Sequence, residues 1–448
     1  MAAGFRTPSC PQSRASDGEL DQPTGPNRAR AERMGMKTPG REAASSRPGV
    51  VFGPLHGVRV LDLAGRAGDL CGRLLADAGA DVIKVEPPDG NSARQRPPFI
   101  ADTPDPERSL TFLHYNAGKR GITLDYSKPA GRELLLRLVG RADILVEDAG
   151  EDSLARCGIG HSALMKASPG LAHVSITQFG LSGPYRNYAA NDFICFALGG
   201  LMATSGEPGM PPIVAPGELA YAVASGYAAL GGLIAYYNCA LTGEGQLVDV
   251  SIHEAAAFTA GYAVPVYTAT GEKPFRQSWK KRLFDLYDVY PTKDGFIRIF
   301  IMPKKHWQSL LDWLGRPPEL MSEIFNDQKL RWQNSEIIDP FIERLCRGYT
   351  KDGIFREAQR RHIAASPLNT PAEFVQSDQA RARGFLTTVH HPVAGAYPQT
   401  NPVFRFSASP GFVLRRAPTL GEHNTEVFCG ELRLSHTELK ALQSGGIV

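Results

Sequence analysis

The chain has 448 residues, of which 42% are hydrophobic and 21% are charged, and its formal net charge is +3. These proportions are typical of a soluble globular protein, and the length suffices for two domains or one large discontinuous domain. The first fifty residues carry the whole net charge, so the remainder is close to neutral and gives no reason to expect a nucleic acid as partner.

The first fifty residues are also rich in Arg, Ala, Ser, Gly and Pro and nearly free of large apolar side chains. Such a segment buries too little apolar surface to offset the entropy lost on ordering, so residues 1–50 are predicted to form a disordered tail. Seven cysteines are scattered along the chain without the spacing of metal ligands. This pattern predicts reduced thiols, no metal site and a cytoplasmic location.

Alternating strands and helices are predicted from residue 58 onward. A strand at Val58–Leu63, a glycine turn at Gly65–Gly68, a helix at Leu70–Ala78 and a strand at Asp81–Glu86 form a βαβ unit. Such a unit implies a parallel sheet with right-handed crossovers. The alternation continues with strands at 121–124, 143–147 and 172–177, and with helices at 129–139 and near 164–167. The fold class is therefore α/β with an open sheet.

The next block is a long apolar helix predicted over Pro216–Leu241, followed by a turn at Thr242–Gly245 and a strand at Gln246–Ile252. Ala and Gly dominate the helix, and such small side chains let another backbone or a flat ligand come close. The helix is the nearest approach to the roughly twenty apolar residues of a membrane span, but its glycines favour a buried helix, and the N-terminus has no compact apolar signal core. We therefore expect no membrane partner.

The pattern changes after about residue 269. Residues 289–301 read as two strands joined by a Lys-Asp-Gly turn, and helices follow near 306–314, 337–347, 351–361 and 371–377. A final helix begins after Ser435. We therefore expect a tail (1–50), the first part of a large domain (51–270), a small α+β domain (271–390) and a return to the large domain (391–448).

Two features suggest an anionic ligand without identifying it. The Gly65–Gly68 turn lies between a strand and a helix, where backbone N–H groups and the helix dipole favour an anion. Five basic side chains lie near the carboxyl ends of the early strands or in the loops that follow them: Arg94, Arg96, Lys119, Arg120 and Arg156. They are either phosphate ligands or solvated surface charges.

Seven blocks of sequence together resemble one known family: VRVLDLAGRAGDLCGRLLADAGADVIKVE, YNAGKRGITLDYSKPAGRELL, ADILVEDAG, PGLAHVSITQFGLSGPY, LTGEGQLVDVSIHEA, YPTKDGFI and APTLGEHNTEV. In order and spacing, from about residue 54 to the C-terminus, they resemble the class III CoA-transferases (the CaiB/BaiF family). The resemblance implies a Rossmann-like large domain with a parallel sheet built from both chain ends, and a smaller domain between. It also implies an interlocked, ring-shaped homodimer. Acyl-CoA and a carboxylic acid would be the substrates, with no permanently bound cofactor.

The resemblance also implies a set of CoA contacts. By position these are Arg66, Ala67 and Gly68 in the glycine turn, Leu124, the loop Asp148, Ala149 and Gly150, and Arg156 as a ligand of a CoA phosphate. A guanidinium group suits that last role because it makes bidentate, charge-assisted bonds to phosphate. The family also places an arginine just after the second strand, where this chain has Pro87.

In the family an aspartate near the start of the long helix attacks the acyl-CoA thioester, and the corresponding residue here is Ala222. The nearest carboxylate is Glu218, which lies on the same helical face if the helix already runs there. Three hypotheses remain. Glu218 is the nucleophile; or the chain binds acyl-CoA and performs another reaction, such as that of a lyase or dehydratase, or none; or the alignment is shifted and transfer follows another route.

A racemase of the same fold is disfavoured, because such enzymes use a histidine and an aspartate as a pair of bases. Asn191 stands in the histidine position and Ala222 in the aspartate position. Asp192 is expected to cap or orient a helix start. His253 and Glu254, which follow the strand after the long helix, are expected to be structural.

Overall fold

The computed structural model describes residues 53–448, except 262, 274–285, 302 and 410–414. The predicted disordered tail at residues 1–50 lies outside the described residues.

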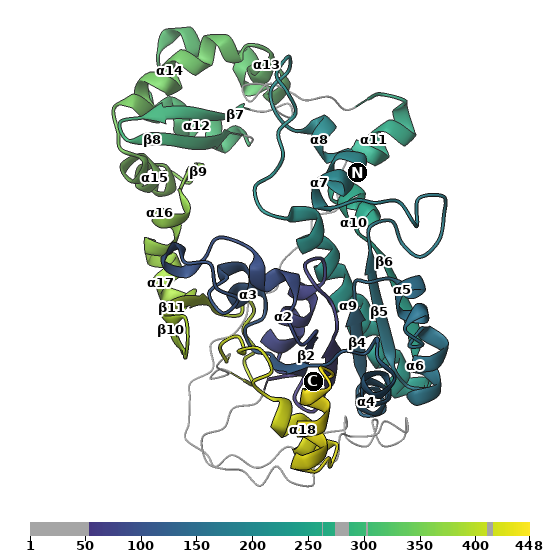
Figure 1. The fold of residues 1–448 in the computed structure, drawn as a ribbon. Coiled ribbons are helices and arrows are strands. Elements are labelled where there is room, and N and C mark those ends of the chain that lie inside the picture. Colours follow the sequence, from purple (N-terminus) through teal and green to yellow (C-terminus); the bar gives the residue numbers. More distant parts are fainter. Residues whose placement is uncertain (1–52, 262, 274–285, 302, 410–414) are drawn as a thin grey trace, which may run out of the picture. The chain divides into compact units, whose positions relative to one another are not determined.

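The large domain contains a six-stranded parallel sheet (Figure 1). Its strands are β1 (Arg59–Asp62), β2 (Asp81–Glu86), β3 (Arg120–Thr123), β4 (Ile144–Glu147), β5 (Ala172–Thr177) and β6 (Gln246–Ser251). Every neighbouring pair is parallel, and the order is β3-β2-β1-β4-β5-β6. This is the order of a Rossmann sheet, whose direction of winding reverses between β1 and β4. The predicted parallel α/β sheet is therefore confirmed.

Alternate side chains of each strand point to opposite faces of the sheet, and an apolar cluster covers each face, so both faces are buried. Val60 and Val174 belong to one apolar cluster, which also contains residues of the helices α2 (Asp69–Asp77) and α9 (Leu219–Thr242). Leu61 and Leu145 belong to a second, with residues of α4 (Pro129–Val139), α6 (His161–Ala167) and the C-terminal segment. The helices before β6 are α2 (Asp69–Asp77), α3 (Leu110–Tyr115), α4 (Pro129–Val139), α5 (Glu151–Arg156), α6 (His161–Ala167), α7 (Asp192–Leu198), α8 (Leu201–Thr204) and α9 (Leu219–Thr242), with single turns η1 (Ser92–Gln95) and η2 (Ile100–Asp102). After β6 come α10 (Ile252–Thr259) and α11 (Ala263–Thr270).

The long helix α9 packs closely on the sheet, against β5 and β6 (Figure 1). A Cβ atom at Gly231 would lie 2.8 Å from Val248 Cγ1, and one at Gly232 would lie 3.0 Å from Val174 Cγ2. These glycines therefore let the helix backbone come close to side chains of the sheet, whereas the close approach of another backbone or a flat ligand stays a prediction. By length and composition alone α9 could also cross a membrane, but 44% of its most apolar stretch is buried within the molecule.

The C-terminal segment packs against the edge of the six-stranded sheet, and its described residues add no strand to it. It contains a π-helix, η5 (Thr425–Glu431), and α18 (His436–Ser444), which Ser435 caps as predicted. At the edge of β3, the backbone N–H of Gly121 donates to His423 Nδ1 and that of Thr123 donates to Asn424 Oδ1. Because side chains take these edge donors, no backbone ladder forms there. The expectation that both chain ends build the sheet was therefore wrong, since all six strands lie within residues 59–251.

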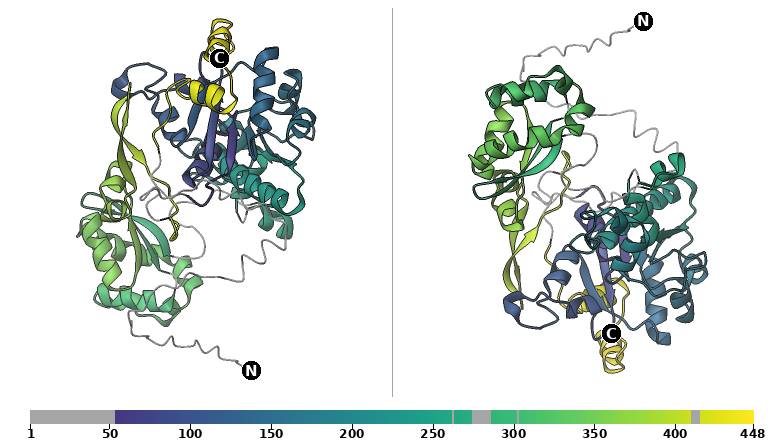
Figure 2. Two further views of the ribbon diagram at one scale, coloured as in Figure 1. Left: turned by 90° about the horizontal axis from the view of Figure 1, so that it is seen from below. Right: turned by 90° about the horizontal axis from the view of Figure 1, so that it is seen from above.

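The segment after residue 285 forms an antiparallel sheet with its own helices, and the predicted hairpin is present. The order is β7 (Leu286–Thr292), β8 (Gly295–Ile301) and β9 (Ala364–Pro367). A separate core includes Trp307, Ile342 and Ile354. The helical elements are α12 (Lys304–Trp313), η3 (Pro318–Leu320), η4 (Glu323–Asn326), α13 (Gln328–Gln333), α14 (Ser335–Arg347) and α15 (Lys351–Arg360). Two short helices, α16 (Pro371–Gln376) and α17 (Asp378–Ala382), lead to a hairpin of β10 (Leu386–His391) and β11 (Gly395–Thr400), seen from two further sides in Figure 2.

Candidate functional site

A cavity of about 440 Å³ lies at the carboxyl ends of the central strands. Residues following β1, β2, β4 and β5 line it, so it occupies the crevice where the winding of the sheet reverses, which is where open α/β sheets bind ligands. Its lining includes four residues that the resemblance assigns to CoA: Arg66, Ala67, Asp148 and Ala149. Pro87 lines it too, so the arginine that the family places there is absent from this cavity.

The glycine turn after β1 already binds an anion, and that anion is a side chain of the protein. Asp148 Oδ1 accepts a hydrogen bond from the N–H of Gly65 at 2.8 Å, and its Oδ2 accepts one from the N–H of Ala67 at 3.1 Å. Burial raises the pKa of Asp148 to about 6, although the hydrogen bond from Gly65 acts in the opposite direction. These two backbone donors are therefore engaged within the chain.

The loop after β4 is held in the same way. Buried Glu147 accepts hydrogen bonds from the N–H groups of Ala149 and Gly150, both at 2.8 Å. Gly150 adopts a φ of 79°, which favours glycine. Gly68, at the start of α2, is required by packing, because an added Cβ would lie 2.6 Å from Ala64 Cβ. A phosphate in the cavity would rely on side-chain donors such as Arg66.

Two further predicted contacts lie away from the cavity lining. Leu124 is only 1% exposed and belongs to the apolar core. Arg156 is exposed at the end of α5. Their contacts with CoA, like those of Gly68 and Gly150, stay predictions.

Most of the basic side chains near the strand ends form buried ion pairs. Arg94 is 1% exposed and binds Glu86 through Nε and Nη2 at 2.7 and 2.8 Å. Lys119 Nζ contacts Asp62 at 2.6 Å, and Arg120 is paired with Asp81 at 2.7 Å. The expectation of either phosphate ligands or solvated charges was wrong for these three residues, because partner carboxylates from other segments already neutralise them. Arg96 differs, since it reaches the pocket described next.

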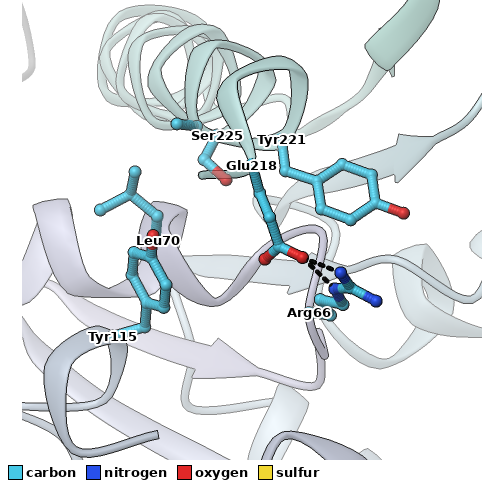
Figure 3. Close-up of a pocket in the computed structure, with 7 residues that line it drawn as sticks. Arg66, Leu70, Tyr115, Glu218, Tyr221 and Ser225 are labelled. Carbon is cyan, nitrogen blue, oxygen red and sulfur yellow. Dashed lines mark hydrogen bonds and ion pairs between the residues drawn. The ribbon is translucent and has the colours of Figure 1, made fainter. Parts of the chain in front are cut away.

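A smaller pocket adjoins the cavity and shares Arg66 and Tyr221 with it (Figure 3). It is lined by Arg66, Leu70, Tyr115, Glu218, Tyr221, Ala222 and Ser225. Glu218 lies at the N-cap position of α9, where its φ of −110° and ψ of 69° are not helical. Its carbonyl accepts a hydrogen bond from the N–H of Ala222 at 2.9 Å. The two residues are therefore one turn apart, as the helix periodicity predicted.

The carboxylate of Glu218 is bound by two arginines. Arg96 forms a bidentate pair, with Nη1 donating to Oε2 at 3.1 Å and Nη2 to Oε1 at 3.0 Å. Arg66 donates to Oε1 from the other side. Burial opposes ionisation, but the hydrogen bonds from Arg96 and Arg66 outweigh it and hold the pKa of Glu218 below its ordinary value. Glu218 is therefore ionised at neutral pH.

The residues in the racemase positions have structural contacts. Asn191 caps α7 through a hydrogen bond from the N–H of Ile194 at 3.0 Å. Asp192 Oδ1 accepts from the N–H of Tyr221 at 2.9 Å, so it caps the start of α9, a helix-start role as predicted. His253 and Glu254 line a different cavity.

The sequence identified Arg96 only as a basic residue and did not predict its pairing with Glu218. It gave no signal that Tyr115 lines the pocket.

The chain matches the family model described as CoA-transferase family III over residues 55–424. It is 32% identical over 387 residues to succinyl-CoA:(R)-benzylsuccinate CoA-transferase subunit BbsE of Thauera aromatica, covering 83% of this chain and 93% of that relative. It is also 32% identical over 400 residues to succinyl-CoA--D-citramalate CoA-transferase of Chloroflexus aurantiacus, covering 88% of this chain and 98% of that one. Among solved structures, a CAIB/BAIF family protein from Brucella suis matches with a TM-score of 0.76 and 30% identity, covering 85% and 99% of the two chains. The chain therefore belongs to CoA-transferase family III.

Proposed function

We propose that this chain transfers coenzyme A between two carboxylic acids, with the acyl-CoA in the large cavity and Glu218 as the carboxylate that accepts the acyl group. The observation that carries the proposal is the position of Glu218. It is an ionised carboxylate one helical turn before Ala222, in a pocket that shares Arg66 and Tyr221 with the cavity.

The reaction divides one difficult exchange into easier steps. An oxygen of Glu218 attacks the thioester carbonyl, the C–S bond breaks and CoA leaves as a thiolate, which gives a mixed anhydride. The thiolate then attacks the glutamyl carbonyl, releasing the first acid as a carboxylate and leaving a glutamyl-CoA thioester. The second acid repeats both steps in reverse, which yields the new acyl-CoA and restores Glu218.

We propose dicarboxylic acids as the donor and acceptor. The names of the two relatives pair succinyl-CoA with benzylsuccinate and with citramalate. Succinate, benzylsuccinate and citramalate each carry two carboxyl groups. The two arginines at the pocket suit a substrate that keeps one negative charge after its other carboxyl group has been esterified with CoA.

Mass spectrometry after incubation with succinyl-CoA and hydroxylamine tests the proposal. Hydroxylamine converts an activated glutamyl group to a hydroxamate, so we expect the modification on the peptide that contains Glu218. Glu218→Gln should lower the transfer rate by about 10³-fold or more, because an amide cannot attack. Glu244→Gln, at an exposed position just beyond α9, is the matched control and should keep the wild-type rate.

A second candidate is an acyl-CoA-binding protein without transferase chemistry. The observation in its favour is that both oxygens of Glu218 are bound by guanidinium groups, which lowers the nucleophilicity of a carboxylate. An unmodified chain that still binds CoA would support this candidate. Conversion of the acyl-CoA without any acceptor acid would support a lyase.

We also propose that the chain is a homodimer of interlocked rings. An exposed apolar stripe on α9 supports an interface: Tyr227, Leu230, Ile234, Tyr237 and Leu241. Their spacing of three and four residues places them on one face of the helix, and Ile234 is 57% exposed. A face of this kind on a soluble protein marks an interaction site. We propose that a second copy, rather than a membrane, covers it.

Subunit exchange tests the interlocked dimer. Threaded rings cannot separate without unfolding, so tagged and untagged dimers should form mixed dimers only after denaturation and refolding. Rapid exchange, or a monomer by light scattering, would contradict threading. A chain that assembles only with a second family member would instead favour a heteromer.

We also propose a cytoplasmic location. The six cysteines in the described part of the chain are free thiols, as is usual in a reducing compartment.

A further inference from the structure

The contact between Glu218 and two arginines has the form of a substrate site that the protein itself fills. Arg96 approaches from the loop after β2 and Arg66 from the turn after β1, whereas Glu218 belongs to the segment before α9. The bidentate pair formed by Arg96 is the geometry in which arginine recognises a free carboxylate. Two arginines contact the carboxylate of Glu218, and Asp192, which interacts electrostatically with both Glu218 and Arg66, adds a second negative charge nearby. A substrate carboxylate is therefore accommodated by replacing Glu218 between the arginines.

The backbone just before Glu218 is open at one position. Gly217 has a φ of 81°, and a Cβ added there would meet nothing within 4 Å, although Val214 and Ala215 before it pack against the core. The side chains of Arg66 and Arg96 keep 45% and 28% of their surface exposed. Arg66 lines both the cavity and the pocket, whereas Arg96 lines neither and meets a ligand only in the place that Glu218 occupies.

The remaining lining indicates what kind of anion fits. Leu70 and Ala222 contribute carbon to the lining and Tyr115 a phenol ring, and with Glu218 in place the pocket encloses only about 10 Å³, so an acyl chain enters only where Glu218 has moved. Such walls suit the methylene chain of an acyl group, whereas a polyphosphate would leave them in contact with charge. An acyl chain that ends in a carboxylate would place its carbons against these residues and its charge between the arginines.

We propose that Arg66 and Arg96 bind the distal carboxylate of a dicarboxylic acid or of its CoA thioester, and that Glu218 occupies this site until such a substrate arrives. Displacement removes two guanidinium groups from Glu218 and so restores the nucleophilicity of its carboxylate. A monocarboxylic acyl-CoA lacks the displacing group and leaves Glu218 bound. The arginine pair thereby selects dicarboxylic substrates. The release of Glu218 rests on the proposed transferase function, but the binding of the carboxylate does not.

Binding measurements on Glu218→Gln test carboxylate binding by the two arginines separately from the transferase reaction, because this variant cannot be acylated. Succinyl-CoA and butyryl-CoA have the same number of acyl carbons and differ in the distal carboxylate. By calorimetry we expect Glu218→Gln to bind succinyl-CoA about tenfold more tightly than butyryl-CoA, the scale of a charge-assisted bond. The double variant Glu218→Gln, Arg96→Ala should bring the ratio close to one. This double variant leaves no glutamate that has lost its arginine partner. Arg96→Lys in the same background keeps the positive charge but cannot form the bidentate pair.

Equal affinity of Glu218→Gln for both thioesters would overturn the proposal, as would a ratio that survives in both Arg96 variants. If loss of Arg96 weakens free CoA as much as succinyl-CoA, the arginine binds phosphate and the proposal is wrong. Arg356→Ala, on the exposed surface of α15, is the matched control and should change no affinity. An Arg96-dependent ratio in a chain that transfers no CoA would sustain the site while rejecting the transferase.

Discussion

Two carboxylates near the cavity, Asp148 and Glu218, are stabilised in different ways. Asp148 accepts hydrogen bonds from two neutral backbone N–H groups, and burial raises its pKa to about 6. Glu218 is bound by two arginines, and its pKa is lowered despite burial. Both have several donors, so the charge of the donors, rather than their number, decides the direction. Asp148 therefore holds the turn together, whereas Glu218 is an ionised group at an open pocket.

The largest expected effect is on stability. Asp148→Ala leaves the N–H groups of Gly65 and Ala67 without their acceptor and should lower the free energy of unfolding by about 2–3 kcal/mol. Glu218→Ala removes a more exposed ion pair and should cost less than about 1 kcal/mol. Urea denaturation of both variants measures the difference. Equal losses would remove the distinction between the two carboxylates.

The second prediction concerns a cation outside the cavity. By resemblance Arg156 binds a phosphate of CoA, so Arg156→Ala should weaken CoA binding by about 1.5–3 kcal/mol, the scale of a charge-assisted hydrogen bond. Calorimetry with CoA measures this, and Arg141→Ala, also exposed, is the control. Unchanged affinity would remove Arg156 from the site and leave phosphate recognition to the cavity side chains.

The third prediction adds a carboxylate beside Glu218. Ala222→Asp places it where, by resemblance, the family carries its nucleophile, one turn along α9, and should raise the transfer rate by about tenfold. Ala222→Asn has a similar shape without a nucleophilic oxygen and should give no increase. A folded, CoA-binding Ala222→Asp variant without a gain would show that residue 222 is not the nucleophile position.

The last prediction concerns the pH dependence of the free energy of unfolding. Because folding raises the pKa of Asp148 from about 4 to about 6, its protonated form stabilises the fold, and this stabilisation is lost as the pH rises through that interval. Wild type should therefore lose about 2 kcal/mol relative to Asp148→Asn between about pH 4 and about pH 7. Urea titrations at several pH values check this, with Asp152→Asn, an exposed site, as the reference. A difference that grows in the opposite direction would contradict the assignment.

Local patterns predicted much of the fold. The bounds of β2, β5 and α4 agree with the structure, because hydrophobic periodicity and flanking turn residues determine them within a few neighbouring positions. The relation between Glu218 and Ala222 was predictable for the same reason. The roles of Asp148 and Arg96 were not, since they depend on partners 83 and 122 residues away in the chain. The same holds for the C-terminal segment, which contacts Gly121 of β3 through both the backbone N–H and the side chain of His423.

The contact between the C-terminal segment and the edge strand β3 lowers the tendency of the chain to aggregate. An edge strand with free N–H groups is a template on which other chains add strands and aggregate. Here the side chains of His423 and Asn424 accept hydrogen bonds from the edge N–H groups of β3, and Arg120 in β3 forms ion pairs with Glu426 and Glu431. The segment at residues 423–431 thus protects the sheet edge. It follows all six strands in the chain, so the edge stays uncovered until this segment has been synthesised.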